Sequence, residues 1–272
     1  MKHFFLVLSL SLLASPASAL DVLSWNVESE GADPEIIARQ LAELPRADAY
    51  LLQEVDARDI GRYAAAIRDK YGRSYKYYVS SLGGRDRLAA IVDTSKFHIR
   101  SYTELMSFRN YRLNDYSHRS PLVTHIQRKS DQQEFLLVTV HHARRNEDLR
   151  KEQSVGLSEW AKAQPLPVIL AGDCNFDYDI NAKRGNASYQ AFLATNVWTA
   201  PTLEKDVDTN YDDRDRDGRD DYPGSRLDFA FVKSNGKPLN AKLEIIVRPG
   251  DFPDTKATSD HRPLLLQVTT SQ

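Results

Sequence analysis

Cysteine is nearly absent from this sequence, because Cys174 is the only one among 272 residues. One cysteine excludes an intrachain disulfide, and no cysteine–histidine cluster has the spacing of a zinc site. The Cys174 thiol could act as a nucleophile, or it could pack as a small buried hydrophobe. The core must in either case stabilise the fold without a covalent cross-link.

A surplus of charge of one sign is absent as well. The 36 basic and 38 acidic residues give a formal net charge of −2, which excludes binding of nucleic acid through bulk positive charge but leaves room for a local basic patch. With 41% hydrophobic and 27% charged residues, the composition is that of an ordinary globular protein. No repeat, low-complexity linker or domain boundary is visible, so we expect a single domain over residues 20–272.

Long apolar runs are missing except at the start of the chain. Lys2 and His3 precede the apolar run Phe4 to Leu13, and small residues follow at 17–19. This order is typical of a secretory signal and is too short for a membrane span, although a buried first strand is the alternative. We therefore expect residues 1–19 to be a signal peptide of a secreted or periplasmic protein. We also expect a monomer without a stable membrane anchor.

Short apolar runs of the length of buried strands recur along the rest of the chain. They lie at 20–27, 49–53, 88–92, 122–126, 135–140, 168–171, 227–232, 243–247 and 263–268. Helical patterns lie at about 34–44, 57–71, 147–163 and 189–195. This mixture without strict alternation predicts an α/β protein with mixed sheets and outer helices.

Polar side chains stand at the ends of six of these predicted strands. They are Asn26, Gln53-Glu54, His141-His142, Asp173 to Asn175, Asp228 and Asp260-His261. Burying such groups without partners would cost several kcal/mol each, roughly 2–7 by transfer measurements, so six capping turns are a poor explanation. Carboxylate and amide oxygens suit a hard divalent cation such as Mg²⁺, Mn²⁺ or Ca²⁺. Histidines beside carboxylates can protonate a phosphate or activate water, so the set indicates phosphoester hydrolysis.

The ordered motifs that carry these residues resemble one known group, the endonuclease/exonuclease/phosphatase superfamily. The motifs are Leu23-Ser24-Trp25-Asn26, Gln53-Glu54-Val55, Val140-His141, Gly172-Asp173-Cys174-Asn175-Phe176, Leu227-Asp228-Phe229 and Ser259-Asp260-His261-Arg262-Pro263. They span residues 21–268, and the group includes deoxyribonucleases, apurinic endonucleases, inositol polyphosphate 5-phosphatases and bacterial sphingomyelinases. The resemblance implies a four-layer α/β sandwich, with two mixed sheets packed face to face and helices outside.

The resemblance also implies roles for the site residues. Glu54 matches the main metal ligand, with Asn26 and Asp260 beside it. The catalytic set that it implies is His141, Asp173, Asn175, Asp228 and His261. In that set Asp173 orients or deprotonates the attacking water, Asn175 holds phosphate or nucleophile, and Asp228 supports the imidazole of His261. His142 competes with His141, and the position of Cys174 between Asp173 and Asn175 favours packing over nucleophilic chemistry.

Two further segments have more than one interpretation. Arg119, before Ser-Pro and a strand, resembles a family arginine that contacts substrate phosphate. Arg109 and Arg112, among aromatic residues, could grip a nucleic acid strand or form a solvated hairpin. For Arg119 a solvated side chain is the alternative.

Residues 211–221 form an acidic run with the spacing of a calcium loop. Asp213, Asp215, Asp217 and Asp221 stand at loop positions 1, 3, 5 and 9, and Gly218 stands where the loop must turn sharply. Gly224 replaces the usual bidentate glutamate, so an EF-hand is not expected. A structural Ca²⁺ site competes here with a solvated run whose arginines neutralise the aspartates.

Together these patterns predict a secreted phosphoesterase that uses Mg²⁺ or Mn²⁺ and cleaves phosphodiesters, with nucleic acid as the favoured substrate. A phospholipid or inositol-phosphate phosphoesterase is the second interpretation, and the tyrosines at 75–78 could contact a membrane surface in such an enzyme. A non-enzymatic binding protein on the same scaffold is the third, although the polar set is complete.

Overall fold

The computed structural model describes residues 19–115, 119–252, 255 and 257–270. The predicted signal peptide lies outside these residues, apart from Ala19. No helix in the described parts of the chain has the length and apolarity needed to cross a membrane.

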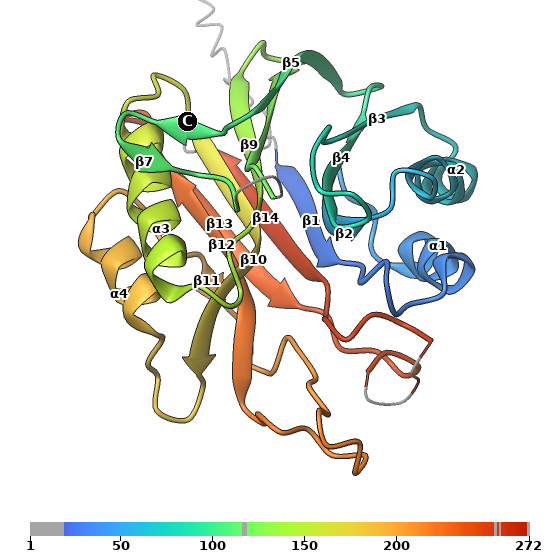
Figure 1. Cartoon of the computed structure of the whole chain (residues 1–272). Coiled ribbons are helices and arrows are strands. Elements are labelled where there is room, and N and C mark those ends of the chain that lie inside the picture. Colours follow the sequence, from blue (N-terminus) through green and yellow to red (C-terminus); the bar gives the residue numbers. More distant parts are fainter. Residues whose placement is uncertain (1–18, 116–118, 253–254, 256, 271–272) are drawn as a thin grey trace, which may run out of the picture.

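Two large mixed sheets form the centre of the molecule (Figure 1). The first has the order β11 (Thr202–Leu203), β13 (Leu239–Ile245), β14 (Leu264–Thr270), β1 (Leu20–Asn26), β2 (Ala49–Val55), β4 (Arg87–Asp93) and β3 (Tyr75–Val79). The second has the order β12 (Ser225–Lys233), β10 (Val168–Asp179), β9 (Glu134–His141), β8 (Leu122–Arg128) and β5 (Phe97–Glu104). A hairpin of β6 (Ser107–Phe108) and β7 (Tyr111–Arg112) stands apart.

Four helices cover the outer faces of the two sheets. They are α1 (Pro34–Glu43), α2 (Ile60–Tyr71), α3 (Glu147–Lys162) and α4 (Ala187–Ala194). Figure 1 shows α1 and α2 on one side of the molecule and α3 and α4 on the other. Three apolar clusters hold the layers together, one between the sheets and one under each helix pair. The four-layer sandwich that the resemblance implies is therefore confirmed.

The alternation of side chains along each strand sends odd and even residues to different clusters. In β10, Ile169 and Ala171 pack between the sheets, whereas Val168 and Leu170 pack toward α3 and α4. The next residue after Ile169 and Ala171 on the same face of β10 is Asp173, so its carboxylate lies at the end of the core between the sheets. The same count places Asn26, His141 and Asp228 on the inner faces of their strands.

The nine predicted strands and four predicted helices are all present, with shifts at some ends. The helix expected from residue 57 begins at Ile60, because the carboxylate of Asp56 accepts the Arg58 N–H and Asp59 occupies the N-cap position. The last helix begins two residues earlier than expected, because the side chain of Asn186 caps it.

Two strands of five or more residues, β3 and β5, were not predicted. Both are edge strands in which most positions are exposed or half-buried, so neither carries a run of buried apolar residues.

Candidate active site

The site lies where the inner faces of both sheets reach one end of the sandwich. In the second sheet, Asp173 pairs with His141 on β9 and with Asp228 on β12. In the first sheet, Asn26 on β1 pairs with Gln53 on β2, next to Glu54. A cavity of about 170 Å³ opens between them, which we call the catalytic pocket. Its lining includes Glu54, Arg119, His141, Arg144, Asp173, Asn175, Asn210, Tyr211, Asp212, Asp260 and His261.

Backbone irregularities aim two of these side chains. The pairing of β2 with β4 shifts after Leu52, and Glu54 has φ 52°; the pairing of β10 with β12 shifts after Asp173, and Asn175 has φ 51°. The left-handed region costs a residue with a Cβ about 1–3 kcal/mol and persists only where the surroundings impose it. Such strain is concentrated at functional sites, which supports a role for both residues.

Three donors meet closely enough to hold a metal ion. Ligand atoms of Glu54, His141 and Asp173 all lie within 4.8 Å of one another. His141 Nε2 is 3.7 Å from Glu54 Oε1 and 3.2 Å from Asp173 Oδ2. The amide of Asn26 donates to both carboxylates, at 3.0 and 3.3 Å, and its oxygen accepts the Glu28 N–H. In this arrangement Asn26 orients the carboxylates, and its own oxygen is already engaged.

Further carboxylates crowd the same pocket, which agrees with a site for a divalent cation. Asp260 lines it, and Glu28 accepts the Asp260 N–H at 3.1 Å. Desolvation and the neighbouring carboxylates of Glu28, Glu54 and Asp173 raise the pKa of Asp260 to about 7, although its side chain is 41% exposed. A cation would relieve this repulsion and favour the ionised form. The donor set is oxygen-rich, as Mg²⁺ and Mn²⁺ require, with one imidazole added.

His261 and Asp228 form a buried pair. His261 Nδ1 lies 2.7 Å from Asp228 Oδ2. Burial lowers the pKa of His261, but the carboxylates of Asp228 and Asp260 outweigh it and hold that pKa well above its usual range. The backbone is fixed as well, since the His261 carbonyl accepts the Trp25 Nε1–H and its N–H donates to Ser259 Oγ. The other ring nitrogen, Nε2, is 4.0 Å from Asp173 Oδ2 and is available to a substrate.

Asp86 belongs to the site although the sequence did not single it out. Its carboxylate accepts the Arg119 Nε–H at 2.6 Å and lies 3.5 Å from His141 Nδ1. Burial raises the pKa of Asp86, but His141 and Arg119 more than compensate, and the result is a lowered pKa. Asp86 directly precedes β4, so its signal was a polar residue at the beginning of a strand rather than at its end.

The two adjacent histidines occupy different environments. His141 lines the catalytic pocket. The next residue, His142, points to the opposite face of the sheet and packs edge-to-face on Phe176, with ring centroids 5.9 Å apart. Burial lowers the pKa of His142 to about 3, and neither ring nitrogen makes a well-oriented hydrogen bond. Cys174 points to the same outer face of the sheet and is fully buried, and this burial raises the pKa of its thiol. His142 and Cys174 thus belong to the packing under the site.

Asn175 presents an acceptor rather than a donor to its surroundings. Its Nδ2 donates to the His142 carbonyl at 2.9 Å and its backbone N–H donates to Asp173 Oδ1, while its buried Oδ1 has no partner. A free amide oxygen suits a water molecule or a cation better than a phosphate oxygen.

The predicted arginines are divided between the site and the surface. Arg119 lines the catalytic pocket, as does Arg144, which the sequence did not single out. Arg109 does not reach it; its guanidinium pairs with Glu159 on α3 at 3.2 Å. Arg112 is also not among the lining residues, and its N–H donates to Glu152 on the same helix.

The acidic loop lies beside the pocket, and three of its four predicted ligands converge. Carboxylate oxygens of Asp213, Asp215 and Asp217 lie within 4.8 Å of one another, and the Gly218 N–H donates to Asp213 Oδ2. Asp221 instead accepts the Arg214 N–H at 2.7 Å. Gly218 has φ 84°, which explains the need for glycine at the turn.

Comparisons with known proteins agree with this geometry. Residues 23–261 match the model of the Endonuclease/Exonuclease/phosphatase family. A search of curated proteins finds no match.

Solved structures share the fold at low sequence identity. A Bacteroides thetaiotaomicron protein of this family is 19% identical, with a TM-score of 0.70 over 95% of this chain and 100% of that one. The mannosyl-6-phosphatase of the same organism is 19% identical, with a TM-score of 0.65 over 92% of this chain and 99% of its own. TDP2 of D. rerio, crystallised with a single-strand DNA product, is 17% identical, with a TM-score of 0.68 over 93% and 100%.

Members of the matched family are metal-dependent phosphoester hydrolases, and the matched segment contains every residue of the predicted catalytic and metal set. The chain therefore belongs to the endonuclease/exonuclease/phosphatase family and is a metal-dependent phosphoester hydrolase.

Proposed function

We propose that the protein is a secreted or periplasmic phosphodiesterase of the nuclease type. The observation that carries this proposal is that a second, larger cavity adjoins the catalytic pocket. Arg144 lines both this pocket and a neighbouring cavity of about 440 Å³, so substrate has room beyond the scissile phosphate. A strand of nucleic acid needs such room, whereas a small phosphomonoester does not. The structural likeness to TDP2 with its single-strand DNA product is in keeping with this choice.

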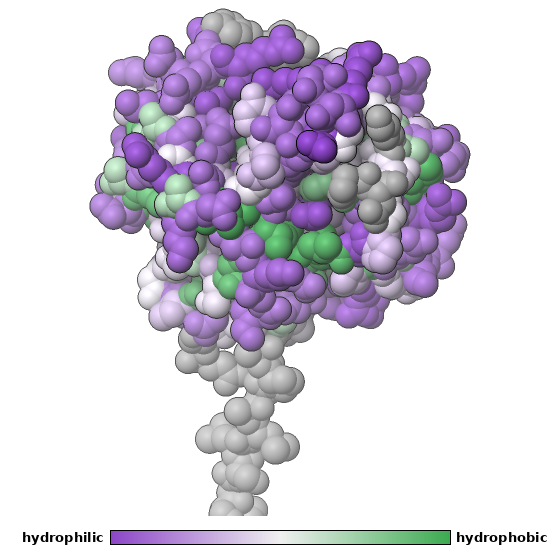
Figure 2. All heavy atoms as spheres, turned by 90° about the horizontal axis from the view of Figure 1, so that it is seen from below, coloured by the Kyte–Doolittle hydropathy of each residue, from purple (hydrophilic) through white to green (hydrophobic). Residues whose placement is uncertain are grey.

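The phospholipid alternative lacks comparable support. Figure 2 shows the molecule from below, the side toward which β1 runs in Figure 1, and hydrophilic residues cover most of this face around a central hydrophobic patch of limited extent. Among the tyrosines at 75–78, Tyr78 stacks on Tyr102 and Tyr75 is half-buried. Tyr77 is exposed, but a single tyrosine makes a poor membrane anchor.

The geometry assigns a task to each group around the phosphate. Asp173, whose pKa is lowered by His141 and His261 despite burial, stays ionised and can accept a proton from water. The free oxygen of Asn175 can hold that water. Arg119 and the cationic His261 can neutralise the phosphate oxygens, and His261 Nε2–H can donate a proton to the leaving oxygen.

We further propose Mg²⁺ or Mn²⁺ at the catalytic site, held by Glu54 with His141 and Asp173, and with Asp260 alongside. A divalent cation supplies charge that stabilises the transition state of phosphoryl transfer. For the acidic loop we propose Ca²⁺, with Asp213, Asp215 and Asp217 as ligands and Asp221 held aside by Arg214.

Export through the predicted signal is part of the same proposal. The first strand begins at Leu20, directly after the expected cleavage site at Ala19. Amino-terminal sequencing of protein recovered from the periplasm or medium should begin at residue 20.

The function is tested by a substrate panel. Purified protein lacking residues 1–19 is incubated with plasmid DNA, single-stranded DNA, RNA, sphingomyelin, inositol phosphates and mannose 6-phosphate, with Mg²⁺, Mn²⁺, Ca²⁺ or EDTA. We expect cleavage of nucleic acid with Mg²⁺ or Mn²⁺ and none with EDTA, and an Asp173→Asn variant to be inactive. Turnover of phosphomonoesters or sphingomyelin without cleavage of nucleic acid would overturn the proposal.

A further inference from the structure

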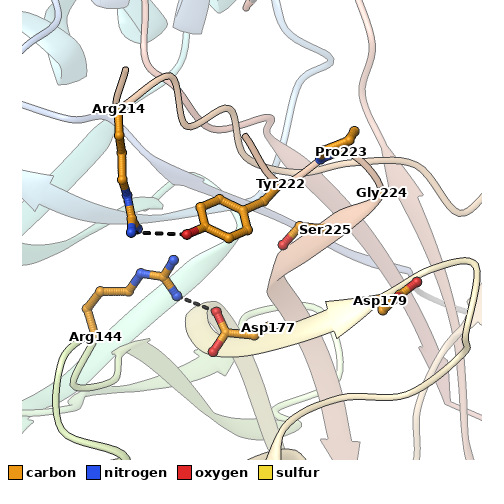
Figure 3. A pocket seen from close by; sticks show the side chains of 8 residues that line it. All are labelled: Arg144, Asp177, Asp179, Arg214, Tyr222, Pro223, Gly224 and Ser225. Carbon is orange, nitrogen blue, oxygen red and sulfur yellow. Dashed lines mark hydrogen bonds and ion pairs between the residues drawn. The ribbon is translucent and has the colours of Figure 1, made fainter. Parts of the chain in front are cut away.

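The cavity beyond Arg144 has walls of two different kinds, which Figure 3 shows. On one wall, Arg144 and Asp177 form an ion pair, with Asp179 further along β10. On the other, the loop before β12 presents Tyr222, whose hydroxyl accepts a hydrogen bond from Arg214 at 3.2 Å. The two aspartates of the first wall lie on β10, and the loop of the second wall leads into β12, which pairs with β10.

Tyr222 is held in place although it is exposed. The Arg214 guanidinium lies 5.0 Å from the centre of the Tyr222 ring, and the backbone N–H of Tyr222 donates to Asp220 Oδ1. Even so, 47% of the residue remains accessible. An aromatic side chain that is positioned by neighbours and left open can stack on a flat ring of a ligand.

The charges around this cavity balance. Two arginines, Arg144 and Arg214, face two aspartates, Asp177 and Asp179. Arg144 is already paired, and Asp177 also accepts a hydrogen bond from Asn186 at 2.9 Å. Arg214 is paired as well, with Asp212 at 2.8 Å, and Arg150 lies 3.6 Å from Asp177. Because both lining arginines are already paired with aspartates, a neutral group with N–H or O–H donors fits this cavity better than a second phosphate.

The backbone of the first wall is strained in the manner of the catalytic residues. Asp177 has φ 41°, and the irregular segment of β10 that contains it runs directly from Asp173 and Asn175. One wall of the cavity is therefore continuous along β10 with the site of the chemistry. Its volume of about 440 Å³ lies within the range of small-molecule sites, about 300–1,000 Å³.

From these observations we infer that the cavity between Arg144 and Tyr222 is a nucleoside subsite, in which a base stacks on Tyr222 beside the scissile phosphate. This inference rests on the proposed nuclease function and adds the element that recognises substrate. Arg144 spans the two compartments and sets the distance between phosphate and base, while Asp177 and Asp179 accept hydrogen bonds from base or sugar.

Two phosphodiesters with the same leaving group test the subsite. Thymidine 5′-(p-nitrophenyl phosphate) and methyl p-nitrophenyl phosphate both release p-nitrophenolate, but only the first carries a base. We expect Tyr222→Ala to lower kcat/KM for the thymidine ester roughly fivefold or more, since loss of one base–aromatic stack costs at least about 1 kcal/mol. The methyl ester should be unaffected, and Tyr222→Phe should behave as wild type.

Controls separate the subsite from the function on which it rests. Tyr77→Ala removes an equally exposed tyrosine from β3 and should change neither substrate. If Tyr222→Ala lowers both esters equally, or neither, while wild type cleaves nucleic acid, the subsite is wrong and the nuclease function stands. If wild type cleaves neither ester nor nucleic acid, the function is wrong and the subsite falls with it.

Discussion

At the scale of single residues, the pair of His261 and Asp228 offers the sharpest test of mechanism. Because their side chains act through one 2.7 Å contact, each alanine variant should lose about 10²–10⁴ in kcat, and the double variant should lose little more. Steady-state rates of the four proteins at saturating Mn²⁺ measure this coupling. Asp228→Asn, which keeps the shape but not the charge, is the matched control for packing. Losses that simply multiply would assign Asp228 a structural role.

His142 gives a prediction about pH and stability. Its pKa of about 3 in the folded protein lies below the ordinary value of 6.5, so unfolding takes up a proton once the pH falls below about 6.5. The stability associated with neutral His142 is therefore complete above pH 6.5. It declines by up to about 1.4 kcal/mol per pH unit as the pH falls toward 3. His142→Leu lacks this titration, so its free energy of unfolding should gain on that of wild type between pH 7 and pH 4.

Urea titrations of both proteins at four pH values measure the difference. At pH 7 the same variant should keep kcat near that of wild type, whereas His141→Ala should lose activity. A gap in stability that does not change with pH would contradict the buried neutral state of His142. Loss of turnover in His142→Leu equal to that in His141→Ala would contradict its placement under the site.

At the scale of elements, the acidic loop tests whether a bound cation stabilises the segment that leads into β12. Extracellular sites of this type bind Ca²⁺ at about 0.1–1 mM, so millimolar Ca²⁺ should stabilise the folded protein by about 1 kcal/mol. In a chain of this size that amounts to about 2–4 °C in Tm. Calorimetry should show the rise in wild type and not in the double variant Asp215→Asn/Asp217→Asn.

The matched control for this loop is Asp69→Asn, which removes an exposed carboxylate from α2 and should respond to Ca²⁺ as wild type does. The double variant should keep its Mn²⁺-dependent activity, because its changes lie outside the Glu54, His141 and Asp173 cluster. An equal Ca²⁺ response in all three proteins would identify the loop as a solvated run of charges.

At the scale of the whole molecule, the cation should join the two sheets. Glu54 belongs to the first sheet and Asp173 to the second, and without a cation their carboxylates crowd with Glu28 and Asp260. Mn²⁺ should therefore raise the Tm of wild type by several degrees and EDTA should reverse the rise. Glu54→Gln should be inactive and insensitive to Mn²⁺, with a metal-free Tm at or above that of wild type. Near-normal turnover of Glu54→Gln at saturating Mn²⁺ would contradict the metal assignment.

The sequence predicted the central strands of the two sheets but not two of the edge strands, β3 and β5. Central strands such as β1 and β10 are buried on both faces and form continuous apolar runs, so they could be recognised. Edge strands such as β3 are partly exposed and contain no run of Leu, Ile or Val, so they could not be recognised.

Within the site, most of the predicted residues line the catalytic pocket, and Asn26 and Asp228 contact it through hydrogen bonds to Glu54, Asp173 and His261. Asp86 and Arg144 escaped prediction because they lie in connecting segments, whose path depends on tertiary contacts. The alternation of side chains along β9 would have distinguished His141 from His142. Phe135 and Leu137 point into the core between the sheets, and every second residue after them, including His141, points the same way.

The hydrogen bond from Asn26 to Asp173 crosses from one sheet to the other within the site itself. Elsewhere the sheets adhere largely through apolar packing, which is not directional and tolerates small sliding movements. Local opening of either sheet at this end must break the polar link as well, so the exchange of amide hydrogens there should be governed jointly by both sheets. Phosphate and Mn²⁺ bound across the link should then slow exchange in β1 and β10 together, and the occupied protein should open as a single cooperative unit.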